Sequence, residues 1–226
     1  VQYYANVRAT DIAGNLSLNA TSDGFQVDFV PPTVVSNSIE SESVVSLTGN
    51  TVISFEVSEP IESAVVTLES ELNGVIEISH QIKDLKNIET TLEGPFTSGD
   101  RLKLAVYGIK DKASNVSVKY EYEYPISYLG DFDIDGTIDI KDFNTFSGAW
   151  QSQNITYELG PVSGQVPFFT PEFDGIYDLK DGMAFYYMWH WDYNQLGKTL
   201  VNTKLKQGNK IDISHSTDRL TVKPPT

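Results

Sequence analysis

Two segments of this 226-residue chain repeat one another at a fixed distance of 39 residues. The first, DGTIDIKDFNTFSGAW, begins at Asp135, and the second, DGIYDLKDGMAFYYMW, begins at Asp174. Identical residues recur at the same offset: Asp135, Gly136, Asp139, Asp142, Phe146 and Trp150 correspond to Asp174, Gly175, Asp178, Asp181, Phe185 and Trp189. Neither segment is large enough to bury its apolar side chains alone, so the repeat predicts two similar units packed on each other.

Each copy is an acidic loop followed by a segment in which Phe and Trp stand four residues apart. That spacing places the two rings on one face of a helix. The second copy continues as MAFYYMWHWDY, with aromatic residues all round the helix. Two interpretations stay open for this helix: its Trp and Tyr side chains form a docking face, or it is packed on both sides and Met183 and Met188 belong to the core.

The first acidic loop, residues 131–142, has the ligand pattern of an EF-hand-type calcium loop. Such a loop places oxygen ligands at positions 1, 3, 5, 7, 9 and 12, with a glycine at position 6 for the sharp turn. Every position is filled here: Asp131, Asp133, Asp135, Gly136, Thr137 through its backbone carbonyl, Asp139 and Asp142. A hard cation compensates the repulsion among these carboxylates, so the loop is predicted to bind Ca²⁺.

The second acidic loop, residues 170–181, fills the same frame less completely. Asp174, Gly175, the Ile176 carbonyl, Asp178 and Asp181 stand at positions 5, 6, 7, 9 and 12, with Glu172 at position 3. Position 1 is Thr170, which brings no charge. Glu158 is the one other carboxylate between the loops and could supply the missing ligand from upstream. A second calcium site is therefore expected, with an uncertain first ligand.

A different repeat, with a spacing of 100 residues, marks the part of the chain before these loops. Asp11, Ala13 and Asn15 recur as Asp111, Ala113 and Asn115, each set between two alternating runs that predict a hairpin. Between the copies, TVISFEVSE, SAVVTLESEL, GVIEISHQI and RLKLAVYGI alternate apolar with polar residues. A period near 100 residues of this kind predicts a β-sandwich, and Pro31-Pro32 predicts a linker.

These signals predict a multidomain chain with four parts. Residues 1–31 are the C-terminal hairpin of an upstream domain, and the start of the chain reads as a strand, as in a fragment of a longer protein. Residues 32–125 form an all-β sandwich, residues 126–195 a small α module, and residues 196–226 a β tail or the start of a further domain.

Composition and motifs exclude several classes of function. The formal net charge of −15 argues against binding to nucleic acid or to anionic membrane surfaces, and no apolar run approaches the roughly 20 residues of a membrane span. There is no Cys for thiol chemistry. His80, His190 and His215 stand in no metalloprotease motif, and the clustered carboxylates belong to the loops, so no catalysis is expected.

The duplicated loop–helix units resemble type I dockerin modules over about residues 127–192, on the Gly130-Asp131 start, the D-x-D-x-D-G pattern and the Asp at the twelfth position. The D-x-A-x-N turns and the alternating strands resemble bacterial immunoglobulin-like domains. In the dockerin family the module binds calcium and docks onto a cohesin domain of another protein outside the cell. The tenth and eleventh loop positions, which in that family often carry a Ser/Thr pair, are here Ile140-Lys141 and Leu179-Lys180.

The resemblance implies a non-catalytic calcium-binding segment of a secreted or cell-surface bacterial protein. The module would dock a cohesin-type partner or fix the geometry of neighbouring domains of the same chain. Two alternatives stay open: a calcium-rigidified segment of an adhesin or surface array, and an accessory region of a polysaccharide-degrading enzyme whose catalytic domain lies outside this fragment.

Overall fold

The computed structural model describes residues 2–206, apart from the side chains of residues 2, 25, 26 and 196–206. The chain forms two compact units that divide between Ser127 and Tyr128. The sequence placed this boundary at residues 125/126. Within the described residues, no helix is long and apolar enough to cross a membrane.

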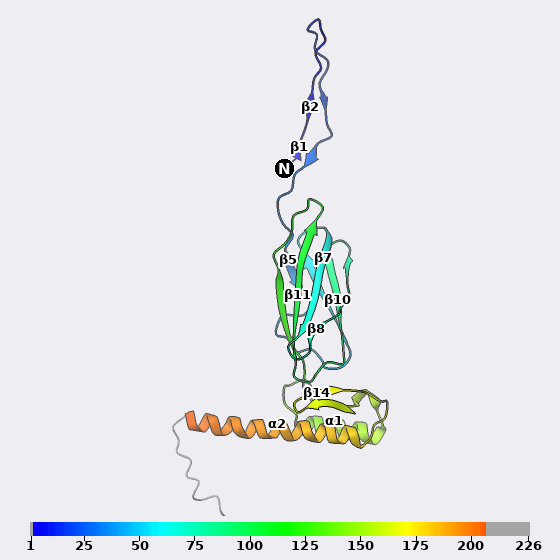
Figure 1. Cartoon of the computed structure of the whole chain (residues 1–226), viewed down its shortest axis with the longest axis vertical. Helices are drawn as coiled ribbons and strands as arrows, with labels where there is room; N and C mark the ends of the chain where they lie inside the picture. Colours follow the sequence, from blue (N-terminus) through cyan, green and yellow to red (C-terminus); the bar gives the residue numbers. More distant parts are fainter. Residues whose placement is uncertain (1, 207–226) are drawn as a thin grey trace, which may run out of the picture. The chain divides into compact units, whose positions relative to one another are not determined.

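The first unit contains a β-sandwich of two four-stranded antiparallel sheets (Figure 1). One sheet has the order β5-β6-β10-β9, formed by Val34–Asn37, Asn50–Val57, Asn87–Glu93 and His80–Lys83. The other has the order β12-β11-β7-β8, formed by Tyr120–Pro125, Arg101–Asp111, Ile61–Ser70 and Gly74–Ile76. The mostly β fold predicted for residues 32–125 is therefore present as a sandwich.

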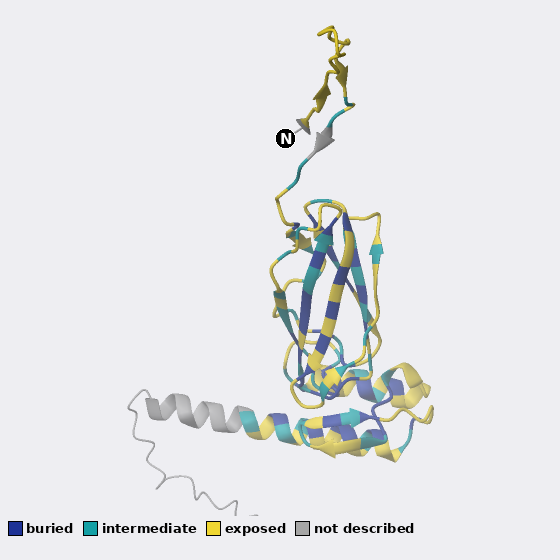
Figure 2. Cartoon of the chain, turned by 45° about the horizontal axis from the view of Figure 1, so that its top comes forward, coloured by how far each residue is buried: buried dark blue, intermediate teal, exposed yellow. Residues whose placement is uncertain are grey.

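Alternation along the strands produces the sandwich core, as the buried and exposed bands in Figure 2 show. Ile53, Phe55 and Val57 of β6 are at most 1% exposed, while Glu56 between them faces solvent. The Phe55 ring meets Tyr122 of the opposite sheet at a centroid distance of 4.9 Å. Burying each such side chain stabilises the fold by about 1.5–3 kcal/mol, so the apolar core holds the two sheets together.

The alternating run GVIEISHQI does not form one strand. It is divided into β8 and β9, which belong to opposite sheets. Both pieces are short edge strands, and β9 pairs with β10, whose Ile88, Thr90 and Leu92 face inward. The alternation continues where the chain passes from one sheet to the other, because alternation depends on which side chains face the core and not on the sheet to which a strand belongs.

The N-terminal hairpin repeats the tip of the β11–β12 hairpin. Its four strands are two residues long: β1 (Gln2–Tyr3) pairs with β4 (Phe25–Gln26), and β2 (Asn6–Val7) pairs with β3 (Ala20–Thr21). At its tip Asp11 accepts hydrogen bonds from the backbone and side-chain amides of Asn15 at 2.8 and 2.9 Å. Asp111 holds Asn115 in the same way, at 2.8 Å for both bonds.

The second unit contains two helices, α1 (Ile140–Ser152) and α2 (Leu179–Lys206). Between them lie the short helix η1 (Ile155–Tyr157) and a hairpin of β13 (Val162–Gln165) and β14 (Phe168–Pro171). For residues 196–226 the sequence left open a β tail or the start of a further domain, and residues 196–206 are helical because α2 continues through them. The rest of that tail, including His215, lies outside the described residues.

The aromatic faces of the two helices meet, as the 39-residue repeat predicted. Phe146 of α1 stacks on its counterpart Phe185 of α2 with a centroid distance of 4.7 Å and an interplanar angle of 14°. Met188 is fully buried beside them, but Met183, which the sequence also assigned to the core, is 46% exposed. The outer side of α2 carries Tyr186 and other exposed aromatic side chains.

Candidate metal centre

The first acidic loop ends by starting α1. Asp139 is the N-cap, and its side chain accepts a hydrogen bond from the Lys141 backbone N–H at 2.8 Å. Asp142, three residues later, accepts from the Asp139 N–H at 2.9 Å, which completes a capping box. Helix α1 therefore begins at Ile140, and Asp142 lies within its first turn, where the helix dipole favours a carboxylate.

Asp131 and Asp142 are buried and tie the two ends of this loop together. Asp131 accepts hydrogen bonds from the backbone N–H groups of Asp135 and Gly136 at 3.2 and 3.0 Å. Asp142 accepts from Phe132 N–H at 2.7 Å. Gly136 has a φ of +87°, a backbone conformation that would be strained for a residue with a side chain. The sharp turn predicted at position 6 is therefore present.

Three carboxylates of this loop converge. Asp131, Asp133 and Asp142 each place one oxygen within 4.8 Å of the others. Burial raises the pKa of Asp131 to about 6, and the neighbouring Asp142 carboxylate adds to the rise, although hydrogen bonds from Gly136 and Asp135 oppose it. The group supplies oxygen atoms alone, which is the donor chemistry that hard divalent cations prefer. These acidic residues could hold a metal ion.

Asp135, the ligand predicted at the fifth position, lies in the same loop but outside this group of three carboxylates. Asp135 accepts hydrogen bonds through Oδ1 from the backbone N–H and the hydroxyl of Thr137, at 3.0 and 2.6 Å. Its other oxygen, Oδ2, accepts from the Lys141 ammonium at 2.8 Å. That hydrogen bond is the main reason why the pKa of Asp135 falls to about 2.

The second acidic loop makes the same hydrogen bonds with Glu158 in the place of Asp131. Glu158 is 6% exposed, and its Oε1 accepts from the backbone N–H groups of Asp174 and Gly175 at 2.6 and 2.9 Å. Asp181 accepts from Leu159 and Asp178 N–H, as Asp142 accepts from Phe132 and Asp139.

The sequence separations show what interrupts the second acidic loop. For three equivalent bonds the separation grows from 4 to 16, from 5 to 17 and from 10 to 22 residues, always by twelve. The β13–β14 hairpin lies inside this added segment. The second acidic loop is thus a version of the first into which a hairpin has been inserted between its second and fifth positions.

The inserted hairpin changes which residues can act as ligands. Glu172, expected at position 3, has an exposed side chain just after β14, and its N–H donates to the Pro161 carbonyl at 2.7 Å. The place equivalent to Asp133 is taken by Gly160, whose N–H donates to Asp181 at 2.9 Å. A Cβ on Gly160 would lie 3.1 Å from the Lys180 carbonyl group, so a ligand side chain at this position would be crowded.

Asp192 is a residue of this centre that sequence reasoning missed. It is 7% exposed, lies on α2, and accepts a hydrogen bond at 3.0 Å from the backbone N–H of Ile138 in the first acidic loop. The sequence offers no signal for this contact, because Asp192 stands 54 residues from Ile138 within an aromatic run.

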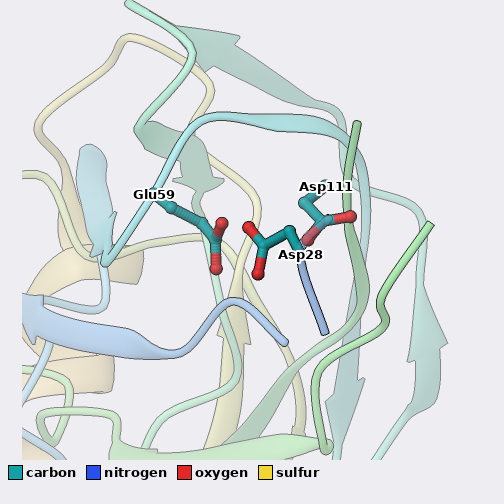
Figure 3. Close-up of side chains that lie close together, drawn as sticks. All are labelled: Asp28, Glu59 and Asp111. Carbon is teal, nitrogen blue, oxygen red and sulfur yellow. The ribbon is translucent and has the colours of Figure 1, made fainter. Parts of the chain in front are cut away.

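A separate acidic group lies in the first unit. Asp28, Glu59 and Asp111 each place one oxygen within 4.8 Å of the others, and their carboxylates face one another in Figure 3. Burial and the two neighbouring aspartates raise the pKa of Glu59. Burial also acts to raise the pKa of Asp111, but hydrogen bonds, first those from Asn115, outweigh it and hold that pKa below its usual value. No sequence pattern singled out Asp28 or Glu59.

Comparison with known proteins adds little to this geometry. No family model matches the chain, and no curated protein matches it. Among solved structures, CopC from Methylosinus trichosporium OB3b is similar with a TM-score of 0.35 and 12% identity, over 42% of this chain and 93% of that one. A likeness this weak carries no argument about function.

Proposed function

We propose that the second unit is a dockerin-like calcium-binding module and that the chain is a non-catalytic, modular segment of a secreted or cell-surface bacterial protein. The observation that carries the proposal is the repeated hydrogen-bond frame of the two acidic loops. A buried carboxylate at the first and the twelfth position accepts hydrogen bonds from the loop backbone, and the carboxylates offer a metal ion oxygen ligands.

Calcium would neutralise carboxylates that otherwise repel one another, so metal binding would be coupled to the folding of this unit. Asp131, Asp133, Asp135, the Thr137 carbonyl, Asp139 and Asp142 would hold the first ion. Glu158, Asp174, the Ile176 carbonyl, Asp178 and Asp181 would hold the second more weakly, because Gly160 supplies no side chain. The immunoglobulin-like sandwich would act as a spacer.

The chain contains its own probe for this test. All three tryptophans, Trp150, Trp189 and Trp191, lie in the second unit, so tryptophan fluorescence reports that unit alone, while a calorimetric scan records the unfolding of both units. We expect millimolar calcium to raise the fluorescence-detected Tm and chelator to lower it, with the calorimetric transition of the sandwich nearly unchanged. Identical fluorescence transitions with calcium and with chelator would refute calcium binding.

A cohesin-type domain is the proposed partner, and the exposed aromatic side of α2 supports this choice because Tyr and Trp anchor interfaces. A panel of purified cohesin domains, tested with calcium and with chelator, separates docking from a purely structural role. Calcium-dependent capture by one member supports docking.

The alternative is a calcium-rigidified segment of an adhesin or surface array. The repeated hairpin tips at residues 11–15 and 111–115 favour it, because a repeat of this kind is expected of similar domains arranged in tandem. Calcium-dependent stability without cohesin binding is the outcome expected of this alternative.

A further inference from the structure

We propose that Lys141 and Lys180 are tethered counter-cations: each ammonium group holds the carboxylate oxygen that the metal ion would otherwise take, so that binding of the ion has to displace it. This inference rests on the proposed calcium binding and names the groups of the chain that regulate it.

In the first acidic loop the competition concerns a single oxygen atom. Oδ1 of Asp135 is already used by the backbone N–H and hydroxyl of Thr137. Oδ2 is the oxygen left for a metal ion, and the Lys141 Nζ donates to it at 2.8 Å. The same ammonium reaches Oδ2 of Asp133 at 3.3 Å. Lys141 therefore bridges the carboxylates of the third and fifth ligand positions.

The second acidic loop repeats this arrangement atom for atom at the fifth position. Oδ1 of Asp174 accepts from the Ile176 N–H at 3.0 Å, and its Oδ2 accepts from the Lys180 Nζ at 2.6 Å. Lys180 also lies 3.9 Å from Oδ2 of Asp178. Because the third position is Gly160, the ammonium group turns to the ninth position for its second carboxylate.

The arrangement has two opposite consequences. Without metal, each lysine offsets part of the repulsion among the carboxylates and so supports the fold of the loop. With metal, the same lysine is a competitor already at the site, and the ion must break its ion pairs. The raised pKa of Lys141 and of Lys180, due first to Asp135 and Asp174 respectively, agrees with this pairing. Both lysine side chains are more than half exposed, so the competition is mild and reversible.

The test uses Lys141→Gln and Lys180→Gln in the full chain, each measured by calcium titration calorimetry and by tryptophan-detected melting in chelator. We expect each variant to bind calcium about two- to fivefold more tightly at its own loop, the range set by loss of exposed ion pairs. In chelator we expect Tm to fall by about 1–5 °C. Lys119→Gln is the matched control, because it removes an exposed lysine that is paired with Glu121 and belongs to the first unit. It should change neither reading.

A third reading separates displacement from a general effect of charge. The ¹⁵Nζ resonance of Lys141 should move toward that of a free lysine when calcium saturates the wild-type chain. An unmoved resonance, or unchanged or weaker calcium affinity in both variants, would overturn the inference while leaving calcium binding intact. Absence of any calcium binding by the wild type would instead refute the proposed function, and an unchanged Tm of both variants in chelator would then refute the counter-cation role as well.

Discussion

The two acidic loops of the second unit hold their backbones with the same hydrogen bonds, yet one is contiguous and the other is interrupted by a hairpin. In the first, Asp131 lies four residues before Asp135. In the second, Glu158 lies sixteen residues before Asp174. The comparison shows that each loop has a buried carboxylate beside the N–H groups of its fifth and sixth positions. This carboxylate can come from the loop itself or from a residue that precedes an insertion.

The largest expected effect is the loss of the twelfth-position carboxylate. Asp181 is fully buried and accepts N–H groups from Leu159, Gly160 and Asp178. Asp181→Ala leaves these donors without an acceptor and should lower the free energy of unfolding of the second unit by about 3–5 kcal/mol. Asp142→Ala removes an acceptor for two N–H groups and should cost less. Urea unfolding in chelator, followed by tryptophan fluorescence, measures both, and equal losses would show that the loops are energetically alike.

The next effect distinguishes the two candidates for the first ligand of the second acidic loop. Glu158→Ala removes the acceptor for Asp174 and Gly175 N–H and should cost about 1–3 kcal/mol. Glu172→Ala, the matched control, removes an exposed carboxylate and should stay within about 0.5 kcal/mol. The same urea titration decides. A larger loss for Glu172→Ala would mean that Glu172, the residue expected from the 39-residue repeat, supports the loop and that Glu158 does not.

A third effect, of similar size, tests why the second acidic loop has no ligand at its third position. In Gly160→Ala the added Cβ would meet the Lys180 carbonyl group at 3.1 Å, which should cost about 1–3 kcal/mol by overpacking. Gly148→Ala on α1 meets nothing within 4 Å and should be neutral or stabilising by up to about 1 kcal/mol. Chelator-treated samples of both variants, melted side by side, provide the measurement. A neutral Gly160→Ala would remove the steric reason for the missing ligand.

The smallest effect is a pH dependence of the first acidic loop. A proton competes with the ion for Asp131, whose pKa burial raises to about 6. Calcium affinity at pH 5, one unit below that value, should therefore be about tenfold weaker than the limit reached above pH 7. Calorimetric titrations across this range provide the check, with Asp131→Asn as the control whose side chain at this position does not titrate. A pH-independent wild-type affinity would contradict it.

Without metal the same shift acts on stability. The pKa of Asp131 in the folded chain lies above its ordinary value of 3.8. The stabilising contribution of the protonated group is therefore complete below pH 3.8 and is lost as pH rises through about 6. In chelator, the Asp131→Asn variant should lack this fall over that interval.

Local sequence patterns predicted much of this fold. Alternation located β6, β7 and β11, because a half-buried strand needs an apolar residue at every second position. The repeat at Phe146 and Phe185 predicted the packing of α1 on α2. The same patterns did not indicate that residues 74–82 change sheets, or that α2 continues from residue 196 to 206.

The sequence by itself determined the first acidic loop, because all its ligand candidates and its turn glycine lie within twelve consecutive residues. It also supplied Glu158 as a candidate for the second. Only the tertiary structure decided that Glu158 replaces Asp131 and that Gly160 stands where Asp133 would be. It also decided that Asp192 accepts a hydrogen bond from the Ile138 N–H. These contacts join residues 16 to 54 positions apart, and the packing of the aromatic core, which no local pattern records, brings them together.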